Sequence, residues 1–130
     1  MKNRNYAVLT IIIFVFCCCG NYKGKPIAIP EVVFLKDTFD FKKIQKGTVI
    51  DVTFNMKNSG KAALIIKNSS VGCGCTKIKS IKDTIEAGET ADLNLIYDSK
   101  NDSGNIIKTV VIETNTTPRL HVLYIKGLVQ

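Results

Sequence analysis

Apolar and polar residues alternate along most of the chain after residue 30, most clearly over 48–58 and 90–98. In the first segment one set of alternate positions is apolar and the other polar; the apolar set is Ile50, Val52, Phe54 and Met56. In the second segment the set expected to point inward is Ala91, Leu93, Leu95 and Tyr97. Because successive side chains of a strand point to opposite faces, a period of two predicts strands with one buried face.

Further segments have the composition or alternation of strands, and residues that favour turns separate them. These expected strands are 62–67, 75–81, 105–114, 120–125 and one that starts at Phe39. The segment 120–125 is apolar on both faces, which predicts a central place in its sheet. No segment has a convincing helical period. About seven short strands with turns every 8–12 residues predict an all-β fold, an immunoglobulin-like antiparallel β-sandwich.

The first residues of the chain follow a different pattern. Lys2 and Arg4 give the N-terminus a positive charge, and residues 6–16 are almost wholly apolar. This run is shorter than the about 20 apolar residues of a membrane-spanning helix, and it fits the hydrophobic region of a secretory signal peptide. Three cysteines follow it: Cys17, Cys18 and Cys19.

An export signal that ends at a cysteine resembles a bacterial lipoprotein signal, in which that cysteine receives the lipid. Cys19 fits best, because a large apolar residue, Phe16, stands three positions before it, and Cys18 fits nearly as well. A plain secretory signal or an uncleaved anchor is the alternative. The lipid would hold the chain at a membrane. The expected organisation is a signal peptide over 1–18, a tether over 19–30 and the sandwich domain over 31–130.

The formal net charge is +7, but the lysines are scattered among apolar residues, as on the solvated faces of strands. The sequence lacks a basic patch with interleaved aromatic residues, the pattern of many nucleic-acid-binding surfaces. It also lacks the motifs of phosphate-binding loops, serine hydrolases and zinc proteases. We therefore expect no nucleic-acid partner, no cofactor and no enzymatic activity.

Two further cysteines, Cys73 and Cys75, stand in the segment Val71–Ile78, "VGCGCTKI". They could be small buried residues beside glycines that allow a tight bend. They could form a disulfide, although Cα atoms two apart in a regular strand lie about 6.5–7 Å from each other, near the upper limit for such a bond. They could also bind a soft ion such as Cu(I), for which the chain offers only His121 and Met56 as further ligands.

Several motifs in this order resemble the bacterial family called domain of unknown function 1573. They are Phe54–Gly60, Cys73–Thr76, Ala87–Glu89, Gly104 with Lys108 and Val110, Thr114–Asn115 and Ile125–Val129. The resemblance covers roughly Glu31 to Gln130 and implies an exported immunoglobulin-like domain, often a lipoprotein of Gram-negative bacteria, with no established activity. Two positions depart from the family: Ala87 stands where proline is frequent, and Lys42–Lys43 where glycine is frequent. Both are turn positions and leave the expected fold unchanged.

The predicted function is that of a non-catalytic envelope lipoprotein, an interaction or scaffold module that contacts another envelope protein or a glycan. The alternative is a periplasmic thiol module that handles redox equivalents or a soft metal through Cys73 and Cys75. We expect the lipid to anchor the chain in the outer membrane of a Gram-negative bacterium, facing the periplasm. The segment Asp83–Thr84–Ile85 also looks like an O-glycosylation acceptor of some Gram-negative periplasmic systems, with Thr84 as the modified residue.

Overall fold

The computed structural model describes residues 27–130. The expected signal peptide, the lipidation at Cys19 or Cys18 and most of the tether lie outside the described residues. Within the described part, no helix is long and apolar enough to cross a membrane.

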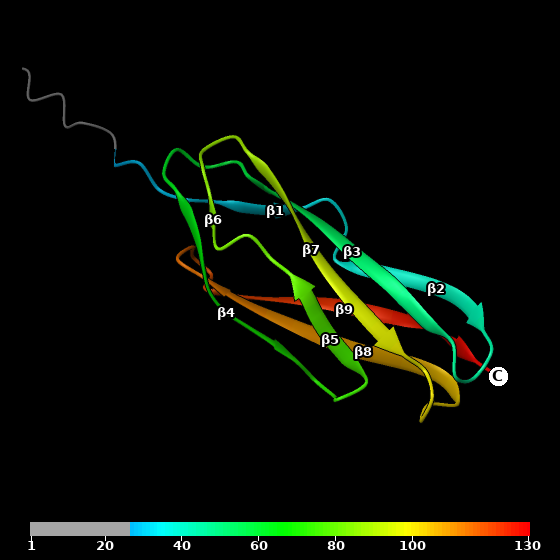
Figure 1. Ribbon diagram of the computed structural model, residues 1–130. Helices are drawn as coiled ribbons and strands as arrows, with labels where there is room; N and C mark the ends of the chain where they lie inside the picture. The colour runs from blue at the N-terminus through cyan, green and yellow to red at the C-terminus, as the bar shows by residue number, and fades with distance from the viewer. Residues whose placement is uncertain (1–26) are drawn as a thin grey trace, which may run out of the picture.

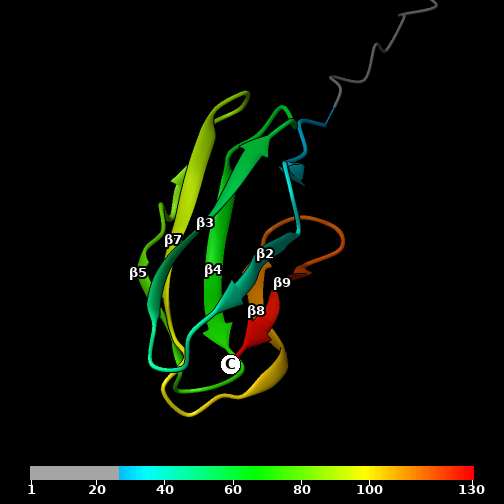
Figure 2. The same cartoon turned by 90° about the vertical axis from the view of Figure 1, so that its right-hand side faces the viewer.

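The described chain folds into nine strands in two facing sheets (Figure 1). The strands are β1 (Val32–Phe34), β2 (Thr38–Ile44), β3 (Val49–Asn58), β4 (Leu64–Val71), β5 (Thr76–Ser80), β6 (Thr84–Ile85), β7 (Thr90–Asp98), β8 (Gly104–Thr114) and β9 (Leu120–Val129). The sheet orders are β1-β3-β7-β5 and β2-β9-β8-β4-β6. Figure 2 shows the two layers from the side. The prediction of an all-β sandwich is confirmed.

The core lies between the two sheets and consists of the inward positions that the alternation predicted. Val52, Phe54 and Met56 come from β3, and Leu93 and Leu95 come from β7. From the other sheet the core receives Leu64, Ile66, Val110, Ile112, Leu123 and Ile125. Each of these side chains is at most 8 % exposed. Removal of apolar side chains from water is the main favourable term in folding, so this layer holds the sandwich together.

The structure adds detail that the sequence pattern did not give. Strands β1 and β6 were not predicted, and β2 pairs with β9 in parallel, whereas the other pairs are antiparallel. Strand β9 lies between β2 and β8, so its predicted central position is confirmed. Its outer face is nevertheless open to solvent, since Leu120, Val122 and Tyr124 are all exposed. Apolar residues on both faces therefore did not mean burial on both faces.

Lys42 is the one residue other than glycine that has a positive φ among the described residues, at 63°. It stands at the irregularity in the β2–β9 pairing between Asp40 and Lys43. Both the backbone amide and the ammonium of Lys42 donate hydrogen bonds to the Asp40 carboxylate. This is the position at which the resembling family often has a glycine, the residue that adopts such a backbone conformation without steric cost.

Candidate functional site

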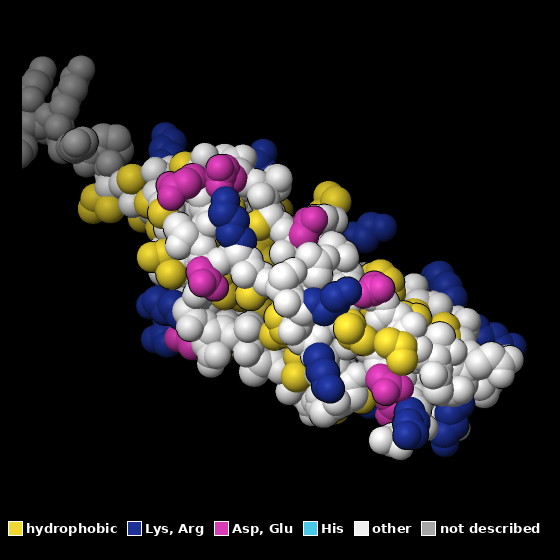
Figure 3. Space-filling view, in the orientation of Figure 1, with side chains coloured by type: hydrophobic (Ala, Val, Ile, Leu, Met, Phe, Trp, Pro, Cys, Tyr) yellow, Lys and Arg dark blue, Asp and Glu magenta, His cyan; other side chains and the backbone are white. Residues whose placement is uncertain are grey.

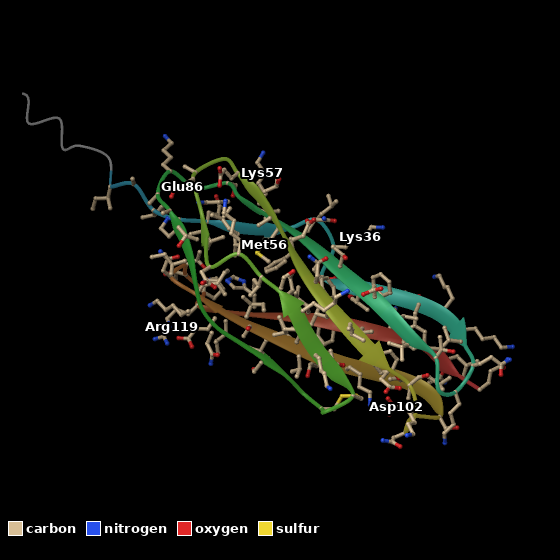
Figure 4. The ribbon with its side chains drawn as sticks, in the orientation of Figure 1. Lys36, Met56, Lys57, Glu86, Asp102 and Arg119 are labelled. Atoms are coloured by element: carbon tan, nitrogen blue, oxygen red, sulfur yellow. A yellow bond between two sulfur atoms is a disulfide. The ribbon has the colours of Figure 1, made fainter. Side chains whose placement is uncertain are left out.

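The turn that joins β4 to β5 carries both cysteines, and the structure joins their sulfur atoms in a disulfide. Their Cα atoms are 5.2 Å apart, closer than in a regular strand. Cys75 packs against the core, and both side chains are half-buried. The Thr76 hydroxyl lies 3.8 Å from the Cys73 Sγ and 3.9 Å from the Cys75 Sγ. Figure 4 shows the disulfide at the end of the sandwich opposite to the start of the described chain.

Backbone hydrogen bonds fix this turn to both sheets. The Gly72 amide donates to the Thr109 carbonyl at 3.0 Å, and the Asp98 amide donates to the Cys75 carbonyl at 2.8 Å. A Cβ atom on Gly72 would lie 2.9 Å from the Thr109 hydroxyl, so the glycine allows a close approach of the turn to β8. A Cβ atom on Gly74 would meet nothing within 4 Å. The tight turn therefore requires the first glycine for contact with β8, whereas the second faces open space.

A polar network stands at the same end of the sandwich. The buried Tyr97 hydroxyl donates to the Asp102 carboxylate at 2.7 Å, and the Lys108 ammonium donates to its other oxygen at 2.7 Å. Burial alone would raise the pKa of Asp102, but the bonds from Lys108 and Tyr97 outweigh it and hold this pKa below its ordinary value. Burial, with the neighbouring Asp102, raises the pKa of Tyr97. The network therefore fixes the 99–103 loop with a charged pair.

The other two residues considered as metal ligands lie away from the cysteines. Met56 is 1 % exposed in the core. The His121 ring accepts or donates hydrogen bonds with the hydroxyls of Thr116 and Thr114 at 2.9 and 3.2 Å, and burial lowers its pKa. Met56 is paired with Ala91, near the start of β7, whereas Cys75 bonds to Asp98, at the end of the same strand. At the usual rise per residue these two positions of β7 are about 20 Å apart, so Met56 is far from the cysteines. Within residues 27–130 no cluster of three or more His, Cys, Asp or Glu could hold a metal ion.

Thr84 lies on β6, where its backbone pairs with Ile65 of β4. Its side chain is exposed, so an enzyme that modifies hydroxyl groups could reach it. O-glycosylation at Thr84 stays a prediction.

One surface was missed by the sequence pattern. Five large apolar side chains on the outer face of the five-stranded sheet are exposed, of which one, Ile65, is on β4. The other four are on β8 and β9, and we call them the β8–β9 patch: Ile107, Leu120, Val122 and Tyr124. The pairing places Val111 opposite Val122 and Thr109 opposite Tyr124. The only sequence signal was the run of apolar residues on both faces of 120–125, which predicted a central place in the sheet and not an exposed apolar surface.

The motif Asn58–Gly60 is structural in this chain. The Asn58 side chain is fully buried and donates to the carbonyls of Ala62 and Ile85 at 2.8 and 2.9 Å. Its Oδ1 accepts from the amides of Gly60 and Glu31 at 3.0 and 3.4 Å. One side chain thus joins the start of β1, the β3–β4 turn and β6.

Comparisons with solved structures give the fold. A protein of unknown function from Porphyromonas gingivalis W83 matches with a TM-score of 0.66 and 14 % identity, over 78 % of this chain and 46 % of that one. The chain thus spans about half the length of that protein. The PapD-like domain 7 of human CEP192 matches with a TM-score of 0.63 and 11 % identity, over 82 % of this chain and 92 % of that domain. The chaperone YadV matches with a TM-score of 0.52 and 15 % identity, over 76 % of this chain and 51 % of that one.

The comparison with curated proteins finds no match. The family model described as "Protein of unknown function (DUF1573)" matches residues 32–129. This range coincides with the nine strands of the sandwich and includes every motif on which the resemblance was based. The chain therefore belongs to the DUF1573 family of proteins of unknown function.

Proposed function

We propose that this chain is a non-catalytic envelope lipoprotein whose sandwich domain serves as an interaction or scaffold module. In this proposal a lipid on Cys19 anchors it in the outer membrane of a Gram-negative bacterium, facing the periplasm. The observation that carries the proposal is the β8–β9 patch. Ile107 is 70 % exposed, Leu120 58 %, Val122 41 % and Tyr124 39 %.

The solvated face of an antiparallel sheet is ordinarily polar. Here the middle of that face presents aliphatic and aromatic side chains on two hydrogen-bonded strands, bordered by the Arg119–Glu113 ion pair and by Lys126. Exposed apolar side chains that gather with a polar rim are typical of surfaces that bind another protein. Three of the four side chains, Ile107, Leu120 and Val122, are aliphatic and offer no hydrogen bonds to sugar hydroxyls, so an envelope protein fits this patch better than a glycan does.

A photo-crosslinking amino acid at Tyr124 in the full chain, expressed in a Gram-negative host that carries its native partners, tests this proposal. The matched control is Thr53, an exposed position on the outer face of the other sheet. We expect one discrete adduct from position 124 and none from position 53, and loss of the adduct in a Val122→Asp background. Equal labelling from both positions would refute a partner at the patch.

A second candidate function rests on the disulfide between Cys73 and Cys75, namely a periplasmic thiol module. A thiolate of a partner dithiol protein would attack one sulfur, giving a mixed disulfide and releasing the other cysteine as a thiolate. The partner's second thiolate would then attack the mixed disulfide. This chain would gain two electrons and two protons as two thiols, and the partner would become the disulfide.

Mass spectrometry of the protein from native membranes, alkylated before and after reduction, separates the two candidates. A mixture of oxidised and reduced Cys73–Cys75 that follows the periplasmic redox state supports the thiol module. A pair that never exchanges, together with an unchanged phenotype in the Cys73→Ser, Cys75→Ser double variant, removes it. The same spectra report the lipid on the N-terminal cysteine.

A further inference from the structure

The first described residues present a row of exposed apolar side chains at alternate positions, here called the N-terminal apolar row: Ile27, Ile29, Val33 and Leu35. Their exposed fractions are 87 %, 64 %, 48 % and 76 %. On β1 the intervening residues, Val32 and Phe34, pack against the core. The row therefore occupies the outward positions of an alternating pattern, where polar residues are usual, and Glu31 is the polar exception.

The row continues into the outer face of the four-stranded sheet. Val33 stands opposite Lys57 of β3, and the Leu35 amide donates to the Asn55 carbonyl at 3.0 Å. A shallow groove of about 210 Å³ runs along this edge. Its lining is mostly side chains of the row and of β3: Val33, Leu35, Asn55, Met56, Lys57 and Thr90.

Lysines flank the row. Lys36 follows Leu35 directly, Lys57 is paired with Val33, and the Lys61 amide donates to the Ile29 carbonyl. Figure 3 shows dark-blue basic, magenta acidic and yellow apolar side chains together at the end where the described chain begins. Apolar side chains with adjacent cations are the composition of surfaces that rest in the headgroup region of anionic bilayers.

Acidic groups face the same edge. Glu31 stands between Ile29 and Val33 of the row, and Glu86 and Glu89 stand on the neighbouring 86–89 turn. Glu89 is paired with Lys82 at 2.7 Å. Asp37 follows Lys36, and Asp92 stands opposite Asn55, so carboxylates at this edge are at least as numerous as the three flanking lysines. Among the described residues these three lysines form no ion pair, which leaves their ammonium groups available to lipid phosphates.

The length of the chain before the row places it near the membrane. Ile27 stands only eight positions after Cys19 in the chain, a reach of at most about 26–29 Å when fully extended. A lipid on Cys19 would hold Ile27, the first residue of the row, within this distance of the bilayer. So short a tether makes the encounter intramolecular, with an effective concentration on the order of millimolar.

We propose that the N-terminal apolar row lies on the surface of the bilayer that holds the lipid, as a second contact beside that lipid. This inference rests on the proposed function, because it requires a chain anchored through its N-terminal cysteine. The contact sets the orientation of the domain: the β1 edge of the four-stranded sheet faces the lipid headgroups, and the β8–β9 patch, on the outer face of the other sheet, faces away. A partner then meets the patch without hindrance from the membrane.

The chain has no tryptophan, so a single introduced indole reports on one position. The full chain is produced in a Gram-negative host with its own N-terminus and reconstituted into vesicles of phosphatidylethanolamine and phosphatidylglycerol with brominated acyl chains. The reporter is Leu35→Trp, and the control is Ile107→Trp, a position of similar exposure on the other sheet. Bromine quenches indole fluorescence only at close range.

We expect the Leu35→Trp emission to be quenched at least roughly twofold more than that of Ile107→Trp, because the apolar side chains of the row would sit at the headgroup boundary. Equal quenching in protein that is bound to the vesicles overturns the contact and leaves the lipid anchor standing. Failure of the protein to stay with the vesicles overturns the anchor and this inference together. The two failures are therefore distinguishable.

Discussion

Asn58 gives the sharpest test of how the family motif acts in this chain. Replacement by alanine removes four hydrogen bonds, to Ala62, Ile85, Gly60 and Glu31. These partners belong to three segments that are far apart in the sequence. The Ile85 carbonyl is the most deeply buried of the four, since its bond to Asn58 is buried on both sides.

The magnitude follows from the geometry. The bonds to Ala62, Ile85 and Gly60 are 2.8–3.0 Å long, and each is worth about 1 kcal/mol net. The bond from the Glu31 amide, at 3.4 Å, is too long to add much. The Ile85 carbonyl would be left without a partner in the interior, at a cost of at least about 1 kcal/mol. We therefore expect Asn58→Ala to lower the free energy of unfolding by about 4 kcal/mol.

Urea denaturation followed by far-ultraviolet circular dichroism measures this loss. The matched control is Asn55→Ala, because Asn55 is an exposed residue of the same strand whose amide bonds only the Asp92 carboxylate. We expect the control to lose no more than about 0.5 kcal/mol. An Asn58→Ala variant as stable as the control would refute the reasoning, and the motif would then need another explanation.

Three further predictions concern single positions. Lys42→Gly should raise the free energy of unfolding by about 0.5–1 kcal/mol, because glycine adopts the positive φ of this position without steric strain. Lys42→Ala should not raise it, and denaturation midpoints compare the two variants. Gly60→Ala should lose about 3 kcal/mol or more, since a Cβ there would overlap the backbone of residues 29–31, while Gly74→Ala should change little in the same assay. The pKa of Asp102 lies below its ordinary value of 3.8, so its stabilising effect is present at neutral pH and is lost as the pH falls through the lowered pKa. Asp102→Asn should therefore flatten the acid side of a stability–pH curve, measured by thermal unfolding.

The period of two predicted the strands that have one buried face. Strand β7 begins at Thr90 and ends at Asp98, as the alternation indicated, and β3 differs by one residue at its start. Strand β9 continues through Gly127 to Val129, beyond the predicted end at 125. A Cβ atom at Gly127 would overlap the Phe41 ring. The glycine therefore marks a close approach between two strands, which the sequence alone does not distinguish from a turn.

The strands β1 and β6 are too short to show an alternating pattern in the sequence. They are strands only because they pair with β3 and β4. Strand β6 has only two residues, and its register with Leu64 and Ile65 exists only once β4 is in place. For the candidate site, the sequence identified Cys73 and Cys75 but not their bond, because the 5.2 Å between their Cα atoms depends on the bend of the turn. The β8–β9 patch was not predicted from the sequence, because apolar residues usually indicate burial and here they are exposed.

The size of the Cys73–Cys75 ring limits what the disulfide can contribute to stability. A closed loop of three residues removes chain entropy worth about 1.6 kcal/mol, a small share of the 5–15 kcal/mol typical of a folded domain. The core layer and the Asn58 bonds do not depend on the disulfide. We therefore expect the fully reduced protein to keep its circular dichroism spectrum and to lose no more than about 2 kcal/mol in urea denaturation. Under that outcome the domain tolerates both redox states, as a thiol module requires. Unfolding on reduction would instead make the bond a structural element and remove the ground for thiol exchange at this turn.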